Sequence, residues 1–329
     1  MTRVACVGTG LVGSAWSVVF AKAGCEVAMF DAAGGAAEDR SRELIGQTLR
    51  LLADTGELDR TPEAIQASIR YVGTLEEALD GVSHVQESAK EDPGVKRQLF
   101  ETLGRLAPRD AVLASSTSAI KGSEFLTFET ADRALVAHPV NPPSLIPLVE
   151  LCGTPRTAPE TIERTHAFMT ALGMAPVVLR KEIDGFLLNR LQYTLVAEAL
   201  HLVGEGYCSA ADIDRVMTQG LALRWATIGP FEVAHLNSPH GFRGFVDHLG
   251  GMMRKMGADA RTDYDWPDSL ASDIHAELLS VVPEARFSER QAWRDANIAA
   301  TRAMQRAAGD RFAESTLSKR RGNDDEPAV

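Results

Sequence analysis

Three glycines near the start of the chain have a spacing that suits a phosphate ligand. Gly8, Gly10 and Gly13 form the pattern G-x-G-x-x-G directly after a short apolar stretch. In such a turn the first glycine permits the bend, the second lets the backbone approach a pyrophosphate, and the third lets the next helix pack closely. Free N–H groups at the start of that helix favour an anion. The pattern predicts a dinucleotide site, to which we also assign Leu11 and Val12.

An acidic residue follows at the distance that this kind of site requires. Asp31 comes directly after an apolar strand expected at residues 26–30. A carboxylate about 20 residues past the glycine turn can accept hydrogen bonds from the adenosine ribose hydroxyls. The alternative is that Asp31 caps the next helix. Residues 32–35 are Ala-Ala-Gly-Gly, with no arginine to receive a 2′-phosphate, so the sequence favours NAD over NADP.

Polar side chains also follow two later strands. Residues 115–118 read Ser-Ser-Thr-Ser, and their hydroxyls either face a crevice at the carboxyl ends of the strands or form a simple turn. His138 ends a strand and precedes a proline-rich turn, while Glu150 lies on the next strand and could reach its imidazole. A histidine held by a carboxylate is an oriented general base, although a lone histidine can also be purely structural.

Asn189 is a further polar residue in apolar surroundings. It falls in the first turns of a helix expected at residues 186–204. A buried asparagine must find hydrogen-bond partners, so it either belongs to a structural network or binds a substrate. The spacing does not separate these two alternatives.

The elements that carry these residues indicate an α/β protein with two domains. Strands alternate with helices over residues 1–183, which predicts a Rossmann-type, mostly parallel sheet that binds NAD. Residues 184–315 have a helical period and predict an all-helical domain for substrate binding and dimerisation. The polar segment 316–329 is expected to be a disordered tail.

Composition excludes several classes of partner. The chain has 329 residues, enough for two domains, and a formal net charge of -11 that argues against nucleic acid. No stretch is apolar and long enough to span a bilayer, and no signal segment is expected. The sequence predicts a cytoplasmic protein with no membrane partner. Single cysteines without metal-binding spacing predict reduced thiols and no metal site; they are Cys6, Cys25, Cys152 and Cys208.

Several segments together resemble one known family. The chain is similar to the 3-hydroxyacyl-CoA dehydrogenase superfamily over nearly its whole length, and most closely to its L-gulonate 3-dehydrogenase (lambda-crystallin) branch. The matching segments are residues 138–143, 146–151, 181–186, 189–193 and 228–230. The resemblance implies NAD-dependent oxidation of the 3-hydroxyl of a small hydroxy acid, with L-gulonate as the expected substrate and 3-dehydro-L-gulonate as the product. It also implies a homodimer formed through the helical domain.

The resemblance also implies roles for individual residues. His138 corresponds to the catalytic base and Glu150 to the glutamate that orients it. Ser118 and Asn189 correspond to residues that bind the substrate and complete the catalytic set. Three further residues are expected on the cofactor side of the cleft: Glu87, Lys96 and Ser116.

Two departures from the acyl-CoA enzymes bear on the substrate. Residues 52–59 are acidic where those enzymes have a lysine-rich segment, which argues against CoA. Arg224, followed by an aromatic residue as in the gulonate branch, could hold a free carboxylate through two hydrogen bonds, or could form an ordinary salt bridge. The alternatives are a short-chain 3-hydroxyacyl-CoA such as 3-hydroxybutyryl-CoA, L-carnitine, and a crystallin-like structural protein that binds NAD without turnover.

Overall fold

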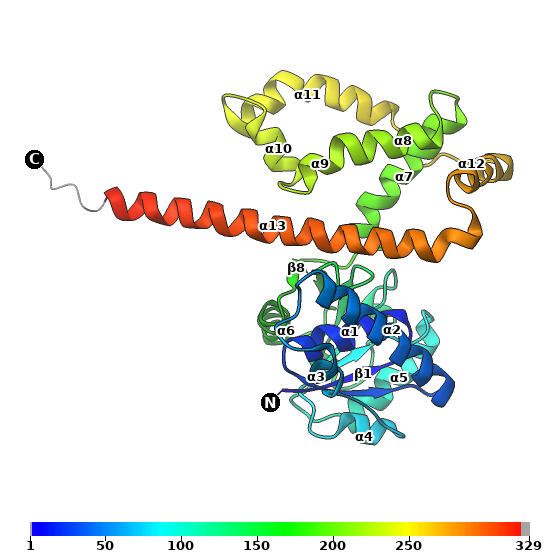
Figure 1. Cartoon of the computed structure of the whole chain (residues 1–329), viewed down its shortest axis with the longest axis vertical. Coiled ribbons are helices and arrows are strands. Elements are labelled where there is room, and N and C mark those ends of the chain that lie inside the picture. Colours follow the sequence, from blue (N-terminus) through cyan, green and yellow to red (C-terminus); the bar gives the residue numbers. More distant parts are fainter. Residues whose placement is uncertain (1, 324–329) are drawn as a thin grey trace, which may run out of the picture. The chain divides into compact units, whose positions relative to one another are not determined.

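The chain forms two compact units, Met1–Arg190 and Leu191–Val329. The structure, a computed structural model, describes residues 2–323, with side chains through residue 308 (Figure 1). We expected the division between residues 183 and 184, a few residues before the junction of the two units.

The first unit is built on one eight-stranded sheet with the order β3-β2-β1-β4-β5-β6-β7-β8. Every neighbouring pair is parallel except β6 and β7, which are antiparallel. The mostly parallel Rossmann-type sheet predicted from the sequence is therefore confirmed. The strands are β1 (Arg3–Val7), β2 (Glu26–Phe30), β3 (Ile69–Tyr71), β4 (His84–Glu87), β5 (Val112–Ser115), β6 (Ala134–Pro139), β7 (Leu148–Cys152) and β8 (Ala175–Leu179).

Helices connect the strands and begin at recognisable caps. Asp92 accepts a hydrogen bond from the backbone N–H of Val95 (2.9 Å) and is followed by Pro93, a pair that starts a helix well because proline has no N–H to leave unpaired. The helices of this unit are α1 (Leu11–Lys22), α2 (Gly35–Asp54), α3 (Pro62–Gln66), α4 (Leu75–Leu79), α5 (Pro93–Leu106) and α6 (Pro159–Ala171), with short 3-10 turns at Gly122–Glu124 and Ala131–Arg133.

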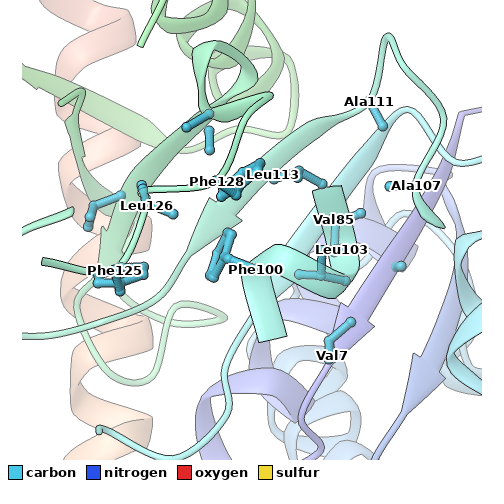
Figure 2. Packing of buried hydrophobic residues seen from close by; sticks show 14 of the residues in the cluster. Val7, Val85, Phe100, Leu103, Ala107, Ala111, Leu113, Phe125, Leu126 and Phe128 are labelled. Atoms are coloured by element: carbon cyan, nitrogen blue, oxygen red, sulfur yellow. The ribbon is translucent and has the colours of Figure 1, made fainter. Parts of the chain in front are cut away.

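Each face of the sheet is covered by a different set of helices. On one face the rings of Phe100, Phe125 and Phe128 form a buried cluster with residues of α4, α5 and the sheet (Figure 2). On the other face Phe20 of α1 stacks on Phe168 of α6, with ring centroids 6.0 Å apart. Since side chains alternate along a strand, Val85 faces the first cluster while its neighbour His84 packs against Phe20.

The second unit is helical throughout its described residues, as the sequence predicted. Its helices are α7 (Leu188–Gly204), which starts in the first unit, α8 (Ala210–Val216), a π-helical segment (Met217–Leu221), α9 (Ala222–Trp225), α10 (Pro230–Leu236), α11 (Gly241–Asp259), α12 (Asp268–Val281), a 3-10 turn (Glu284–Arg286) and α13 (Phe287–Asn323). Helix α13 extends into the segment 316–329, for which we expected disorder, and residues 324–329 lie outside the described part of the chain. Within the described residues no helix has the length and apolarity to cross a membrane.

Candidate active site

The glycine turn has the shape that a bound pyrophosphate needs. Gly8 has a φ of 95°, and a Cβ added to Gly13 would lie only 1.9 Å from the carbonyl oxygen of Gly8. A Cβ added to Gly10 would meet no atom within 4 Å, and no side chain caps the N-terminus of α1 at this residue. The turn therefore packs tightly on its inner side and leaves backbone N–H groups open on its outer side, where NAD fits. Leu11, at the start of the helix, is 63% exposed.

Asp31 is tied to this turn by hydrogen bonds. Its Oδ2 accepts from the backbone N–H of Thr9 (2.8 Å) and from the Thr9 hydroxyl (3.0 Å), and its Oδ1 accepts from the backbone N–H of Ala33 (2.9 Å). Partial burial opposes ionisation, but the donors of Ala33 and Thr9 outweigh it and lower the pKa of the Asp31 carboxyl. Asp31 is thus a carboxylate fixed at the end of β2, beside the glycine turn of residues 8–13, which we call the nucleotide turn.

His138 and Glu150 form a buried pair across two strands. They lie directly opposite each other where β6 pairs with β7, and His138 Nδ1 is 2.9 Å from Glu150 Oε2. The side chains are 5% and 2% exposed. The sequence placed these residues on successive strands, and the antiparallel register is what brings them into contact.

The other oxygen of Glu150 binds the backbone at the start of α7. Glu150 Oε1 accepts hydrogen bonds from the backbone N–H groups of Leu187 (2.8 Å) and Leu188 (3.1 Å) at the start of α7. With both oxygens of Glu150 acting as acceptors, the hydrogen bond between this pair is donated by Nδ1–H of His138. The neutral imidazole then carries no proton on Nε2 and can act as a base there. Phe186, with a φ of 50°, packs its ring 5.2 Å from that of His138.

Ser118 and Asn189 are joined by a second hydrogen bond. Asn189 Nδ2 donates to the backbone oxygen of Ser118 at 2.7 Å. Asn189 directly follows Leu188, whose N–H binds Glu150, so this short segment connects both pairs. The structure thus brings together the four residues that the sequence marked as a catalytic set: His138, Glu150, Ser118 and Asn189.

Glu91 is a site residue that the sequence analysis missed. Its Oε1 accepts from the Thr117 hydroxyl (2.6 Å), the Ser118 N–H (2.8 Å) and the Ser118 hydroxyl (3.2 Å), and its Oε2 is 3.4 Å from Lys96 Nζ. Burial raises the pKa of this carboxyl, but the Thr117 hydroxyl and the Lys96 charge lower it by more. No local sequence pattern marks Glu91, because its hydrogen-bond partners Thr117 and Ser118 lie on a loop more than two dozen residues away.

Glu87 and Lys96 form an ion pair inside the protein. Lys96 Nζ lies 2.8 and 3.1 Å from the two carboxylate oxygens of Glu87, and Ser115 donates to the same carboxylate at 2.5 Å. Glu87 is completely buried and also accepts from the backbone N–H of Ala89 (2.7 Å), while Lys96 reaches on to Glu91. Across the described residues no group of three or more His, Cys, Asp or Glu side chains could hold a metal ion.

Arg224 belongs to the second unit. It is exposed in α9, immediately after the π-helical segment, and no ion pair involves it among the side chains that the structure describes.

A Rossmann-type sheet with a nucleotide turn, an ordered carboxylate after β2 and a histidine–glutamate pair across strands β6 and β7 defines the class of NAD-dependent dehydrogenases. The chain belongs to the 3-hydroxyacyl-CoA dehydrogenase family. Residues 3–183 match the NAD binding domain of that family, and residues 185–277 match its C-terminal domain.

Relatives at the level of the whole chain support this assignment. A lambda-crystallin homolog from Bos taurus is 40% identical over 297 residues, which cover 89% of this chain and 92% of the relative. An L-carnitine dehydrogenase from Streptomyces griseus is 40% identical over 251 residues, covering 75% and 73%. A solved FHMPC 5-dehydrogenase has the same fold, with a TM-score of 0.81 at 24% identity, covering 93% and 99% of the two chains. The protein is therefore an NAD-dependent dehydrogenase that acts on a CH–OH group.

Proposed function

We propose that the enzyme oxidises the 3-hydroxyl of a small free hydroxy acid, with L-gulonate to 3-dehydro-L-gulonate as the first candidate. The observation that carries this proposal is the buried His138–Glu150 pair next to the Ser118–Asn189 pair, in a chain that resembles lambda-crystallin homologs over 89% of its length.

In this mechanism the histidine moves the proton. Bound NAD supplies the acceptor for the hydride. His138 takes the proton of the substrate hydroxyl on Nε2, and Glu150, held in place by its backbone hydrogen bonds, stabilises the imidazolium that forms. General-base assistance of this kind contributes about 10²- to 10⁴-fold to the rate.

Ser118 and Asn189 hold the reacting oxygen in this proposal. The Ser118 hydroxyl, 3.2 Å from Glu91 in the structure, turns its proton to the substrate oxygen as negative charge develops on it. Asn189 is kept beside it by its bond to the Ser118 backbone. Both residues then contribute by orientation as well as by charge stabilisation.

Arg224 is the proposed anchor for the substrate carboxylate. Its guanidinium is exposed and unpaired among the described side chains, and it follows a π-helical segment, a local distortion that is frequent at functional sites. A guanidinium binds a carboxylate through two parallel hydrogen bonds, whereas an acyl-CoA thioester offers no such anion. L-Carnitine also carries a free carboxylate and is the second candidate, favoured by the relative from Streptomyces griseus.

A panel of substrates tests the proposal directly. Turnover is followed by NADH absorbance with L-gulonate, L-carnitine and 3-hydroxybutyryl-CoA. We expect the highest kcat/KM with L-gulonate. Preference for the CoA ester would contradict the free-acid proposal, and absence of turnover with every 3-hydroxy compound would support a crystallin-like structural role.

The anchor is tested with Arg224→Met. Loss of a charge-assisted hydrogen bond costs about 1.5 to 3 kcal/mol, so kcat/KM for the best acid should fall roughly 10- to 150-fold while NAD affinity is retained. Arg243→Met is the matched control, since Arg243 is an exposed arginine of the same unit that pairs with Asp247 at 3.0 Å. Normal efficiency of Arg224→Met would remove Arg224 from the substrate site.

The same proposal includes a homodimer formed through the helical unit. No residue of α7 is fully buried within one chain, although Tyr193 and Val196, three residues apart on one side of this helix, are 60% and 41% exposed. Apolar helix faces of this kind are suited to a subunit interface. The cytoplasmic location stays a prediction.

A further inference from the structure

A network of hydrogen bonds, buried at its inner end and part-buried at its outer end, runs from β4 toward the nucleotide turn, and the catalytic mechanism does not use it. Four polar side chains form the part nearest the turn: Trp16, Gln86, Ser116 and Ser88. Trp16 Nε1 lies 3.1 Å from the Ser116 hydroxyl oxygen, Gln86 Nε2 lies 2.8 Å from it, and Ser88 Oγ lies 2.9 Å from it.

The contacts of Gln86 determine which atom is the donor in each of these hydrogen bonds. Gln86 Nε2 also faces the backbone oxygen of Ala137 at 3.5 Å, and because that oxygen only accepts, the amide nitrogen is on this side. Gln86 Oε1 therefore faces His84 Nε2 at 3.1 Å and accepts a proton from it. Burial lowers the pKa of His84 to about 4, so the ring is neutral at physiological pH and its one proton is on Nε2.

The positions of the hydroxyl protons of Ser116 and Ser88 follow from these donors. A serine oxygen has two lone pairs, and both lone pairs of Ser116 accept N–H donors, one from Trp16 and one from Gln86. The Ser116 proton must therefore be donated to Ser88 Oγ. Ser88 in turn cannot donate to Ser116, so its own proton points elsewhere. In the part of the chain that the structure describes, no other side chain or backbone group is hydrogen-bonded to Ser88 Oγ.

Ser88 lies against the nucleotide turn. Its backbone oxygen is 2.5 Å from the position of a Cβ added to Gly8, and its own Cβ is 3.5 Å from a Cβ added to Gly13. Its backbone N–H is bonded to the oxygen of Val7, the last residue of β1, at 2.7 Å. Ser88 is half-buried, so its hydroxyl is partly shielded from solvent.

We propose that Ser88 is a cofactor-binding residue whose hydroxyl is held as a donor by the Trp16–Gln86–Ser116 chain and binds a pyrophosphate oxygen of NAD. A free serine hydroxyl must lose its alternative orientations when it binds an anion. Here the chain has already set the orientation, which makes the donor pre-organised. The acceptor is an anion because the uncapped N-terminus of α1 and the open side of Gly10 favour negative charge at the same place.

The test measures binding without turnover. Dissociation constants are obtained from NADH fluorescence titrations and from displacement by ADP-ribose, which contains the pyrophosphate, and by adenosine, which does not. Ser88→Ala should weaken NADH and ADP-ribose roughly tenfold or more, the typical effect of removing a hydrogen bond to a charged group, and should leave adenosine unchanged. Ser83→Ala is the control, since Ser83 lies at the opposite end of β4, where its hydroxyl binds the backbone oxygen of Arg3.

A second variant tests the chain itself. Gln86→Met keeps a side chain of similar volume and removes one donor to Ser116, so Ser116 can accept from Ser88. It should weaken ADP-ribose binding in the otherwise unmodified protein and have no further effect when combined with Ser88→Ala. Equal affinities of Ser88→Ala and the unmodified protein for ADP-ribose would overturn the proposal, as would an equal loss for adenosine. Independent effects of the two substitutions would overturn the role of the chain.

Discussion

At the scale of residues, one carboxylate determines what the histidine can do. Glu150 accepts two backbone N–H bonds on one oxygen and the His138 bond on the other, so both of its oxygens are occupied. The imidazole gains a fixed tautomer and a stabilised cationic form from the same contact.

This arrangement separates the effects of two substitutions. His138→Ala should lower kcat by about 10²- to 10⁴-fold and leave the NAD dissociation constant nearly unchanged, because it removes the base and no contact of the nucleotide turn. Glu150→Gln should also lower kcat, since an amide does not stabilise the imidazolium and its one oxygen cannot accept both from Nδ1–H and from the N–H groups of α7. Stopped-flow or steady-state kinetics with a parallel NADH titration measure both quantities. Near-normal turnover of His138→Ala would exclude it as the base.

The sequence anticipated part of this site. His138, Glu150, Ser118 and Asn189 were identified, and they meet in the structure. Glu91 was missed because its three partners on the loop at 117–119 become neighbours only when β4 and β5 pair. Single-sequence patterns report neighbours within a helix or strand, whereas this contact depends on tertiary structure.

At the scale of elements, local sequence patterns predicted some helix and strand boundaries, and the others depend on long-range contacts. The strand at 26–30 and the helix at 230–236 match β2 and α10. The helix expected from residue 186 begins instead at Leu188, because Gly185 and Phe186 take left-handed backbone conformations and the next N–H groups bind Glu150. The antiparallel pairing of β6 and β7 was likewise absent from the strand pattern, which does not encode direction.

Two glycines of the nucleotide turn should respond differently to the same change. Gly13→Ala places a methyl group 1.9 Å from the Gly8 oxygen, so the strand and α1 must separate, at a cost of about 1 to 3 kcal/mol. We expect a lower Tm for this variant even without cofactor. Gly10→Ala meets no atom within 4 Å, so its Tm should be unchanged while its NAD affinity falls. Differential scanning calorimetry and NADH titration distinguish the two; a Tm loss for Gly10→Ala as large as that for Gly13→Ala would contradict this reading of the turn.

At the scale of the whole molecule, the helical unit leaves more apolar surface than one chain needs. Large apolar side chains of this unit are about half exposed or more, among them Met252, Met256, Trp266 and Trp293. Met252 and Met256 are four residues apart in α11 and so share one face of that helix, and an exposed apolar helix face suits a subunit interface.

We therefore expect the purified protein to be a dimer. Light scattering at micromolar concentration should give twice the chain mass of 35.5 kDa, and a dilution series should show when the two chains separate. A mass of one chain at every concentration would refute the dimer. Binding of NAD by that single chain would then show that the nucleotide site does not need a partner.

Because Glu150 has both a catalytic and a structural role, it also affects how the sequence of this enzyme could change during evolution. Its carboxylate serves the base, and it also caps the helix that leaves the first unit, a structural contact that persists when no reaction is catalysed. In a lineage recruited for a purely structural task, selection on His138 would relax while selection on Glu150 would continue. We expect His138 to be substituted before Glu150 in such a lineage. A relative that keeps the glutamate but lacks the histidine would then have lost turnover and kept its fold.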